Sequence, residues 1–258
     1  MKSKKIFATI LLVALFTGNL FAQSANEINK KSMDAIEVGN MEMISTINIR
    51  DARGNNRVRK ITTASKQFGN VTKMIIRFIS PADVKGTALL VHDYEKKSDD
   101  MWIYMPALRK VRRIVSSEKS KNFMGSEFTN GDMSKPNLDN YNSTILGSVN
   151  YGGRNCWKIQ SVGKTSAIQA EDGFSKRISY IEKSTYLCHK VEYYDLRGRL
   201  HRTQTISDYR RLKNGKYFAY KMVMENNKNG RKSEMIINNF QLGSNLSESA
   251  FAPAALNK

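Results

Sequence analysis

Short runs of alternating apolar and polar residues fill most of this chain, and tight turns separate them. In Val71 to Ile79, for example, Met74, Ile76 and Phe78 alternate with Lys73 and Arg77. Successive side chains of a strand point to opposite faces, so each run predicts a strand with one apolar and one polar face. We expect about ten strands, and their short connections favour an antiparallel meander. The other clear runs are 41–50, 57–65, 156–162, 187–194, 200–212, 217–225 and 233–242.

Helices are few by comparison. Ala25 to Gly39 has helical periodicity with Ser24 as a plausible N-cap, and parts of 116–137 and 167–173 are weaker candidates. A large one-faced sheet with so little helix to cover it must curl around its own apolar side. A curled sheet above about eight strands leaves internal room, which is either plugged by the helices or open to a ligand. Twelve methionines favour a ligand.

The first residues have the parts of a secretory signal peptide: a basic start, an apolar run from Ile6 to Phe16, and a small residue, Ala22, at the predicted cut. We therefore expect residues 1–22 to be a signal peptide and residues 23–258 to form a single exported domain, since no linker or repeat divides them. No cysteine follows the predicted cut, so a lipoprotein anchor is not indicated.

The net charge of the whole chain is +19, and about +16 remains after residue 22. Such a charge favours anionic surfaces, either nucleic acid or acidic phospholipid headgroups, and export argues against nucleic acid. The alternative is that the basic surface only keeps the protein soluble.

Residues 101–114 join an apolar, aromatic run to a dense basic run across Pro106. The aromatic run needs an apolar surface to pack against, whereas the four cations of the basic run need water or anions. The segment is therefore typical of a rim where an apolar interior meets a charged exterior. The four cations of this predicted basic rim are Arg109, Lys110, Arg112 and Arg113.

No catalytic or metal-binding motif stands out, so we expect no enzyme, no metal and no cofactor. Trp102 and Tyr104 share one strand face, where core packing or the lining of an acyl cavity explains them more simply than cofactor stacking. Cys156 and Cys188 lie in different strand-like runs. Buried thiols are slightly favoured over a disulfide, although export permits one.

Three blocks of sequence carry a resemblance to a known family. They are Pro81-x-Asp-x-Lys-Gly-Thr-Ala88, Trp102-Ile-Tyr-Met-Pro-Ala-Leu-Arg-Lys-Val-Arg-Arg-Ile114, and Phe123-Met-Gly-Ser-Glu-Phe128 with Asp132. In order and spacing they resemble the outer-membrane lipoprotein-sorting family, the LolA-like proteins often linked with lipid-exporting transporters. The resemblance covers essentially all of residues 23–258. Glu127 stands where the family usually has Asp, and Asn130-Gly131 where an aromatic residue and an acid are usual, which puts the local loop geometry in doubt.

The resemblance implies an incomplete β-barrel, mainly β with a few helices that cover the open side, in the periplasm of a Gram-negative bacterium. It also implies an apolar cavity that accepts acyl chains, and it supplies no catalytic residues. We therefore expect a periplasmic carrier of lipid or lipoprotein acyl chains that touches membranes transiently and hands its cargo to an outer-membrane acceptor. The alternatives are a scaffold that docks on a membrane transporter through its basic face and, less favoured, a lipid hydrolase. The expected cavity lining is Met43, Ile47, Ile49, Met74, Ile76, Phe78, Trp102 and Tyr104.

Overall fold

The computed structural model describes residues 23–95 and 97–257, so the predicted signal peptide lies outside the described residues. The three α-helices are α1 (Ala25–Ile36), α2 (Ser116–Lys119) and α3 (Ser166–Asp172). The strands are β1 (Met41–Arg50), β2 (Asn56–Phe68), β3 (Val71–Ser80), β4 (Ala88–Tyr94), β5 (Asp100–Met105), β6 (Lys110–Ile114), β7 (Tyr141–Tyr151), β8 (Arg154–Gly163), β9 (Lys176–Glu182), β10 (Cys188–Tyr194), β11 (Leu200–Arg211), β12 (Tyr217–Asn226) and β13 (Lys232–Leu242).

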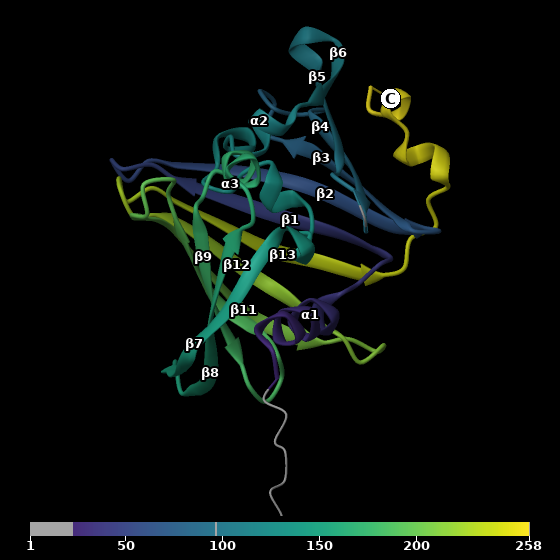
Figure 1. Cartoon of the computed structure of the whole chain (residues 1–258). Helices are drawn as coiled ribbons and strands as arrows, with labels where there is room; N and C mark the ends of the chain where they lie inside the picture. Colours follow the sequence, from purple (N-terminus) through teal and green to yellow (C-terminus); the bar gives the residue numbers. More distant parts are fainter. Residues whose placement is uncertain (1–22, 96, 258) are drawn as a thin grey trace, which may run out of the picture.

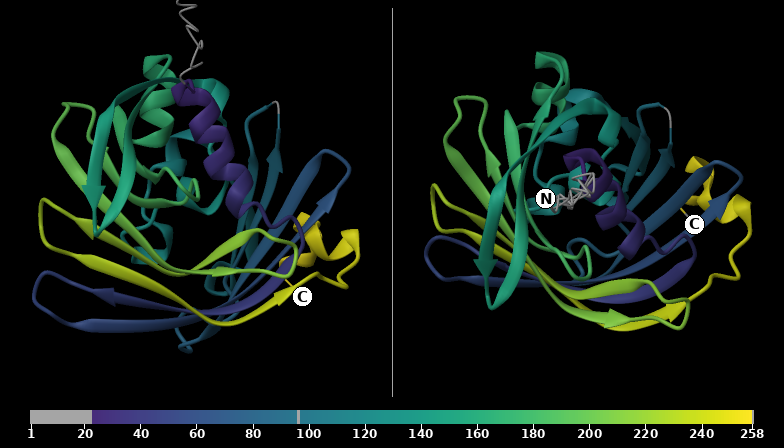
Figure 2. Two further views of the ribbon diagram at one scale, coloured as in Figure 1. Left: turned by 90° about the horizontal axis from the view of Figure 1, so that it is seen from below. Right: turned by 60° about the horizontal axis from the view of Figure 1, so that its bottom comes forward.

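All of these strands belong to one antiparallel sheet in the order β6-β5-β4-β3-β2-β1-β13-β12-β11-β10-β9-β8-β7. The sheet curls strongly but does not close, and α1 lies inside the curve (Figures 1 and 2). The predicted fold, a curved antiparallel sheet forming an incomplete barrel with helices over its open side, is confirmed. We call the inner side of the curve the concave face.

Helix α1 begins at a capping box, in which the side chain of Ser24 accepts from the Glu27 N–H at 3.2 Å and Glu27 accepts from the Ser24 N–H at 2.8 Å. The helix ends at Ile36, short of the predicted Gly39, because Glu37 already has an extended backbone. Ile28 is fully buried and packs on Ile159 of β8. These contacts hold the first half of α1 against the sheet.

The register of the ladders gives the sheet two distinct ends. The β1–β2, β12–β13 and β10–β11 turns lie at one end, which we call the hairpin end, together with the β5–β6 turn. The β11–β12 and β2–β3 turns lie at the opposite end, which we call the open end. The two ends carry different side chains.

The two edge strands, β6 and β7, are joined by residues 115–140, which we call the plug segment. Its predicted helical character is limited to the four residues of α2 and three short 3-10 turns, η2 (Phe123–Gly125), η3 (Gly131–Met133) and η4 (Leu138–Asn140). The plug segment lies over the concave face in front of the sheet (Figure 1). The chain therefore covers its own open side.

The outer face of β2–β5 is covered by residues 243–257, the C-terminal strap, which contains η5 (Glu248–Phe251) and η6 (Pro253–Ala255) (Figure 2). Phe251 and Leu256 are fully buried there. Arg77 donates hydrogen bonds to the carbonyl oxygens of Ala255 at 2.6 Å and Leu256 at 3.0 Å. The strap therefore packs on the outer face, opposite to the face that the plug segment covers.

Both cysteine thiols are free. Cys156 lies on β8 and Cys188 on β10, and β9 separates the two strands. The favoured prediction was two buried thiols on different strands; Cys156 is buried, whereas Cys188 is only partly buried. None of the helices within the described residues has both the length and the apolar character needed to cross a membrane.

Candidate functional site

The plug segment fills the hairpin end of the concave face with two aromatic rings. Phe123 and Phe128 are almost fully buried, and the Phe123 ring centroid lies 5.5 Å from that of Phe78 on β3. Both rings belong to the main apolar cluster, which also includes Ile47 and Ile103. Side chains of the protein itself therefore occupy this part of the interior.

Three arginines from the sheet hold the plug segment in place. Arg59 of β2 donates to the carbonyl oxygen of Met124. Arg231, in the β12–β13 turn, donates to the carbonyl oxygen of Gly125 at 3.1 Å. Arg202 of β11 donates to the carbonyl oxygen of Glu127 at 3.2 Å and to the Asp132 carboxylate at 2.8 Å. Cations on three separate strands or turns thus clamp one loop.

Glu127 is the central acid of this clamp. Its side chain is only 3% exposed and forms an ion pair with Arg231 at 2.7 Å. It also accepts from the Asn226 amide at 2.9 Å, and its backbone N–H donates to Ser233 at 2.8 Å. A buried carboxylate is tolerated only with such partners. Glu127 stands out in the sequence only as a departure from the family pattern, and its partners were not predictable because they lie about 100 residues away in the chain.

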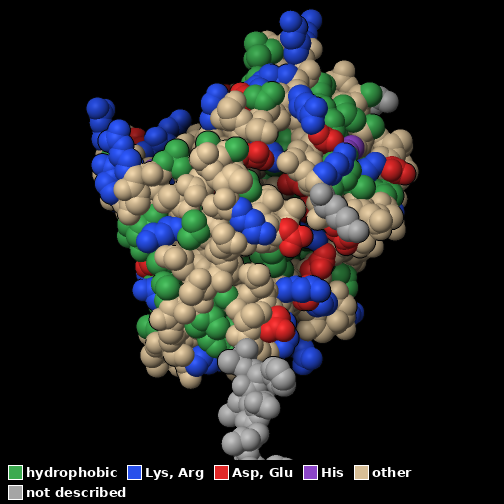
Figure 3. All heavy atoms as spheres, in the orientation of Figure 1, with side chains coloured by type: hydrophobic (Ala, Val, Ile, Leu, Met, Phe, Trp, Pro, Cys, Tyr) green, Lys and Arg blue, Asp and Glu red, His purple; other side chains and the backbone are tan. Residues whose placement is uncertain are grey.

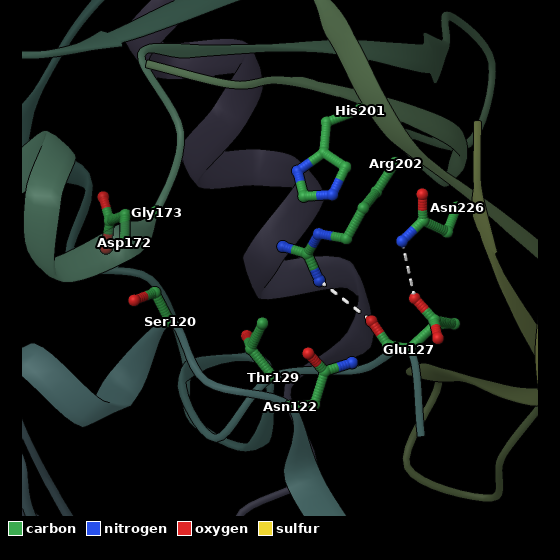
Figure 4. Close-up of a pocket in the computed structure, with 9 residues that line it drawn as sticks. All are labelled: Ser120, Asn122, Glu127, Thr129, Asp172, Gly173, His201, Arg202 and Asn226. Atoms are coloured by element: carbon green, nitrogen blue, oxygen red, sulfur yellow. Dashed lines mark hydrogen bonds between the residues drawn. The ribbon is translucent and has the colours of Figure 1, made fainter. Parts of the chain in front are cut away.

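A small polar pocket of about 50 Å³ lies beside the clamp (Figure 4). Gly173 lines it where the end of α3 approaches α2, and a Cβ there would lie 2.6 Å from the Cβ of Ser120. Burial raises the pKa of Asp172 and of Tyr141, whose hydroxyl donates to Asp172 at 2.6 Å. The space suits a few water molecules and is too small and polar for an acyl chain. Its lining is Ser120, Asn122, Glu127, Thr129, Asp172, Gly173, His201, Arg202 and Asn226.

The concave face near the open end is different, because its apolar side chains are only partly buried. The Phe218 and Phe240 rings pack at a centroid distance of 4.4 Å with a tilt of 36°, and the Tyr220 ring centroid lies 6.1 Å from that of Phe240. Methionines on neighbouring strands continue this surface, which we call the open apolar face. Its members are Met43, Met74, Phe218, Tyr220, Met222 and Phe240.

The predicted cavity lining divides into three groups. Ile47, Ile49, Ile76 and Phe78 are on the concave face but at most 3% exposed, so they form solid core beneath the plug segment. Met43 and Met74 belong to the open apolar face. Four members of that face were missed, although the alternation of Phe218, Tyr220 and Met222 in β12 was a usable signal.

Trp102 and Tyr104 do not lie on the concave face, which corrects the predicted lining. They pair with Leu90 and Ala88 of β4, and all four belong to the cluster beneath the C-terminal strap. The inward residues of β5 are instead Met101 and Ile103. The prediction that Trp102 and Tyr104 share one strand face is correct, but this is the outer face and not the concave face.

The predicted basic rim lies on the β5–β6 hairpin at the edge of the sheet. Arg112 pairs with Glu118 at 2.7 Å, and Arg113 pairs with Asp100. Arg109 and Lys110 are exposed and make no ion pair with any residue of 23–95 or 97–257. The turn that carries them is at the hairpin end, far along the strands from the open apolar face.

A second, larger groove of about 340 Å³ lies mainly on the outer face, between the central strands and the start of the C-terminal strap. Ile44, Ala64, Ile75 and Leu246 give it an apolar floor, and Glu42 and Arg77 line its sides. Among the residues described, no three His, Cys, Asp or Glu side chains gather into a group that could hold a metal ion.

Comparisons with known proteins agree with this architecture. A family model described only as "Uncharacterized protein" matches residues 70–258. A crystal structure of an outer membrane lipoprotein-sorting protein domain from Vibrio parahaemolyticus has 28% identity and a TM-score of 0.84, covering 91% of this chain and 98% of that one. A DUF1329 family protein from Desulfovibrio piger has 27% identity and a TM-score of 0.82, covering 90% and 97%.

A LolA superfamily protein from Nitrosomonas europaea has 20% identity and a TM-score of 0.71, covering 90% of this chain and 98% of that one, and this likeness concerns the fold alone. No curated protein matches this sequence significantly.

Proposed function

The chain belongs to the LolA-like family of outer-membrane lipoprotein-sorting proteins, and from this premise we propose that it is a periplasmic carrier of lipid or lipoprotein acyl chains. The cargo is held without covalent chemistry and passed on towards the outer membrane. The single observation that carries the proposal is the open apolar face, where methionine and aromatic side chains remain partly exposed on the concave side of the sheet.

The chemistry of this surface suits an acyl chain. Burying a methylene is worth roughly 0.8 kcal/mol, so a 16-carbon chain costs on the order of 12 kcal/mol to leave in water. Flexible thioethers such as Met43 and Met222 adapt to cargo of variable shape, and the Phe218 and Phe240 rings supply rigid apolar area. In this proposal Ile47, Ile49, Ile76 and Phe78 are the packed core beside the site. The predicted basic rim meets lipid headgroups or an acidic partner at the other end of the sheet.

The test is binding of a fluorescent fatty acid to delipidated protein. Met222→Gln keeps the length of the side chain but places a polar amide on the open apolar face, so we expect weaker binding. Ile44→Gln is the control, because Ile44 of β1 lines the outer groove, whose lining does not include Met222. Failure of the native protein to bind would reject the carrier. Selective loss with Ile44→Gln would place the cargo in the outer groove.

A second candidate is a scaffold that docks on a membrane transporter or the cell envelope, and the filled hairpin end favours it. Phe123 and Phe128 already occupy that part of the interior, as expected of a protein with no cargo. Mass spectrometry of gently purified protein separates the two functions, because a carrier retains lipid and a scaffold does not.

A further inference from the structure

The hairpin end carries an unusual concentration of positive charge. Residues 50–57, 195–199 and 226–232 contain eight Lys and Arg, two Asp and no Glu, a net charge of +6. Basic side chains gather at the upper left of the molecule, where Figure 1 places the end of β1 and β2 (Figure 3). We call these three turns the basic hairpin row.

The sheet order brings the three turns together. They belong to the β1–β2, β12–β13 and β10–β11 hairpins, whose six strands are neighbours in the sheet. Strands lie about 4.8 Å apart, so successive turns are spaced by roughly 10 Å and the row is roughly 25 Å long. Asp195 joins two of the turns, because it accepts from Arg199 at 2.9 Å and from Lys228 at 2.8 Å. Two of the three turns are therefore held together by an ion pair, and the third is brought beside them by the pairing of β1 with β13.

Most of its cations have no acidic partner. Arg53, Arg197 and Lys232 are exposed, as are Arg50 and Arg57, and none of the five forms an ion pair with another described residue. Asp51 forms no ion pair with these described cations, and its carboxylate accepts from Asn55 and from backbone N–H groups of its own turn. The charge is thus available to an external anion.

Exposed apolar side chains accompany the charge. Leu196, at the tip of the β10–β11 turn, is 57% exposed, and Leu200 is 37% exposed. Long cations around a projecting leucine suit a soft, negatively charged surface into which one side chain can insert. A folded protein partner would instead favour a well-packed pocket with aromatic anchors.

We propose that the basic hairpin row docks this protein on the headgroups of an anionic phospholipid bilayer. The proposal is independent of cargo binding, because the row and the open apolar face lie at opposite ends of the sheet. It also differs from headgroup contact by the predicted basic rim, which lies on the β5–β6 hairpin.

The experiment is co-sedimentation of the purified protein with vesicles of phosphatidylcholine alone or with added phosphatidylglycerol, at low and high salt. We expect binding only to the anionic vesicles and release by salt, as for any surface charge interaction. The test variant carries Arg53→Gln, Arg57→Gln, Arg197→Gln and Lys232→Gln. Each loss should weaken binding about fivefold, and the four together several hundredfold.

The matched control carries the same number of charge losses at exposed cations away from the row: Lys30→Gln, Lys31→Gln, Arg211→Gln and Lys213→Gln. It should bind like the native protein. If the two variants bind anionic vesicles equally weakly, only the net charge of the protein matters, and the proposal is overturned. So would failure of the native protein to bind anionic vesicles, a result that favours an acidic protein partner instead.

A second measurement does not depend on removing charge. Leu196→Trp adds a third tryptophan to Trp102 and Trp157, at the tip of the β10–β11 turn. The emission of the variant minus that of the native protein should shift to the blue and be quenched by brominated lipid when anionic vesicles are added. An unchanged spectrum in the presence of bound vesicles would show that another surface makes the contact.

Discussion

Arg202 is the residue whose loss should most clearly separate the plug segment from the sheet. Its side chain is 8% exposed and donates both to the Asp132 carboxylate and to the Glu127 carbonyl oxygen. Burial alone would lower the pKa of Arg202, but the facing Asp132 and other neighbours outweigh burial and raise it. Arg202→Met keeps most of the apolar volume and removes the charge.

The expected loss of stability in Arg202→Met comes from the Asp132 carboxylate that remains. Asp132 is 16% exposed, and Arg202→Met leaves its carboxylate without its cationic partner. Breaking a buried pair in this way costs about 3 to 5 kcal/mol. In a domain of this size that corresponds to a fall of roughly 6 to 20 °C in the melting temperature. Arg57→Met, at an exposed cation without an ion pair, should change stability by less than about 0.5 kcal/mol.

Urea denaturation measures the cost, and a double variant tests its cause. Asp132→Asn removes the negative charge but keeps an oxygen to accept from the Thr129 N–H, which now lies 2.7 Å from Asp132. Arg202→Met with Asp132→Asn should therefore be more stable than Arg202→Met alone. If the double variant is less stable than the single one, the unpaired carboxylate is not the source of the cost.

Hydrogen exchange locates the effect. The Phe123 N–H donates to the Phe128 carbonyl oxygen at 2.7 Å and the Asn130 N–H to that of Lys121 at 3.0 Å, so both amides report on the plug segment. They should exchange faster in Arg202→Met, while amides of the β8–β9 ladder keep their protection. If amide exchange becomes faster throughout the protein, or does not become faster in the plug segment, Arg202 does not act as a local clamp.

Two further changes have clear expected results. Burial, with help from Asp99, raises the pKa of Asp93 to about 6, above its usual 3.8, so the folded state holds the proton more tightly and stability should fall as pH rises from about 4 to 6. Asp93→Asn should therefore raise the melting temperature more at pH 7.5 than at pH 4, and the opposite order would contradict this reasoning. Phe251→Ala empties a fully buried site under the C-terminal strap and should cost about 3 to 5 kcal/mol in urea denaturation, yet leave fatty-acid binding unchanged because the strap is on the outer face. Weaker fatty-acid binding by folded Phe251→Ala would contradict that separation.

The sequence predicts most strands inside the sheet because each of them has one clearly apolar face, but β4 and β9, which also lie inside the sheet, were not predicted. In β3, Met74, Ile76 and Phe78 point inward as their alternation indicates. The edge strand β7 escaped prediction for the opposite reason. Ile145 and Leu146 are consecutive and both exposed, so the strand has no apolar alternation to detect.

The site was less predictable than the sheet, since its geometry depends on which face of the sheet each strand shows to the interior. Alternation groups Trp102 with Tyr104 but does not say that the C-terminal strap, some 150 residues later, covers them. The three arginines that hold the plug segment were not predictable for the same reason. In the sequence Arg59, Arg202 and Arg231 have no feature that distinguishes them from other cations, and only the fold brings the plug segment into contact with them.

The opposite characters of the two ends follow from how the gap in the barrel is covered. The plug segment starts at β6 and ends at β7, and its aromatic rings enter the apolar interior only at the hairpin end. Their carbonyl and carboxylate groups then need donors, which arginines of the adjacent strands and turns supply. The two aromatic rings of the plug segment do not reach the open end, where Phe218, Phe240 and their neighbours stay only partly buried. A molecule docked on a membrane through its basic hairpin row would therefore present its apolar face away from that membrane, where a second partner can reach it.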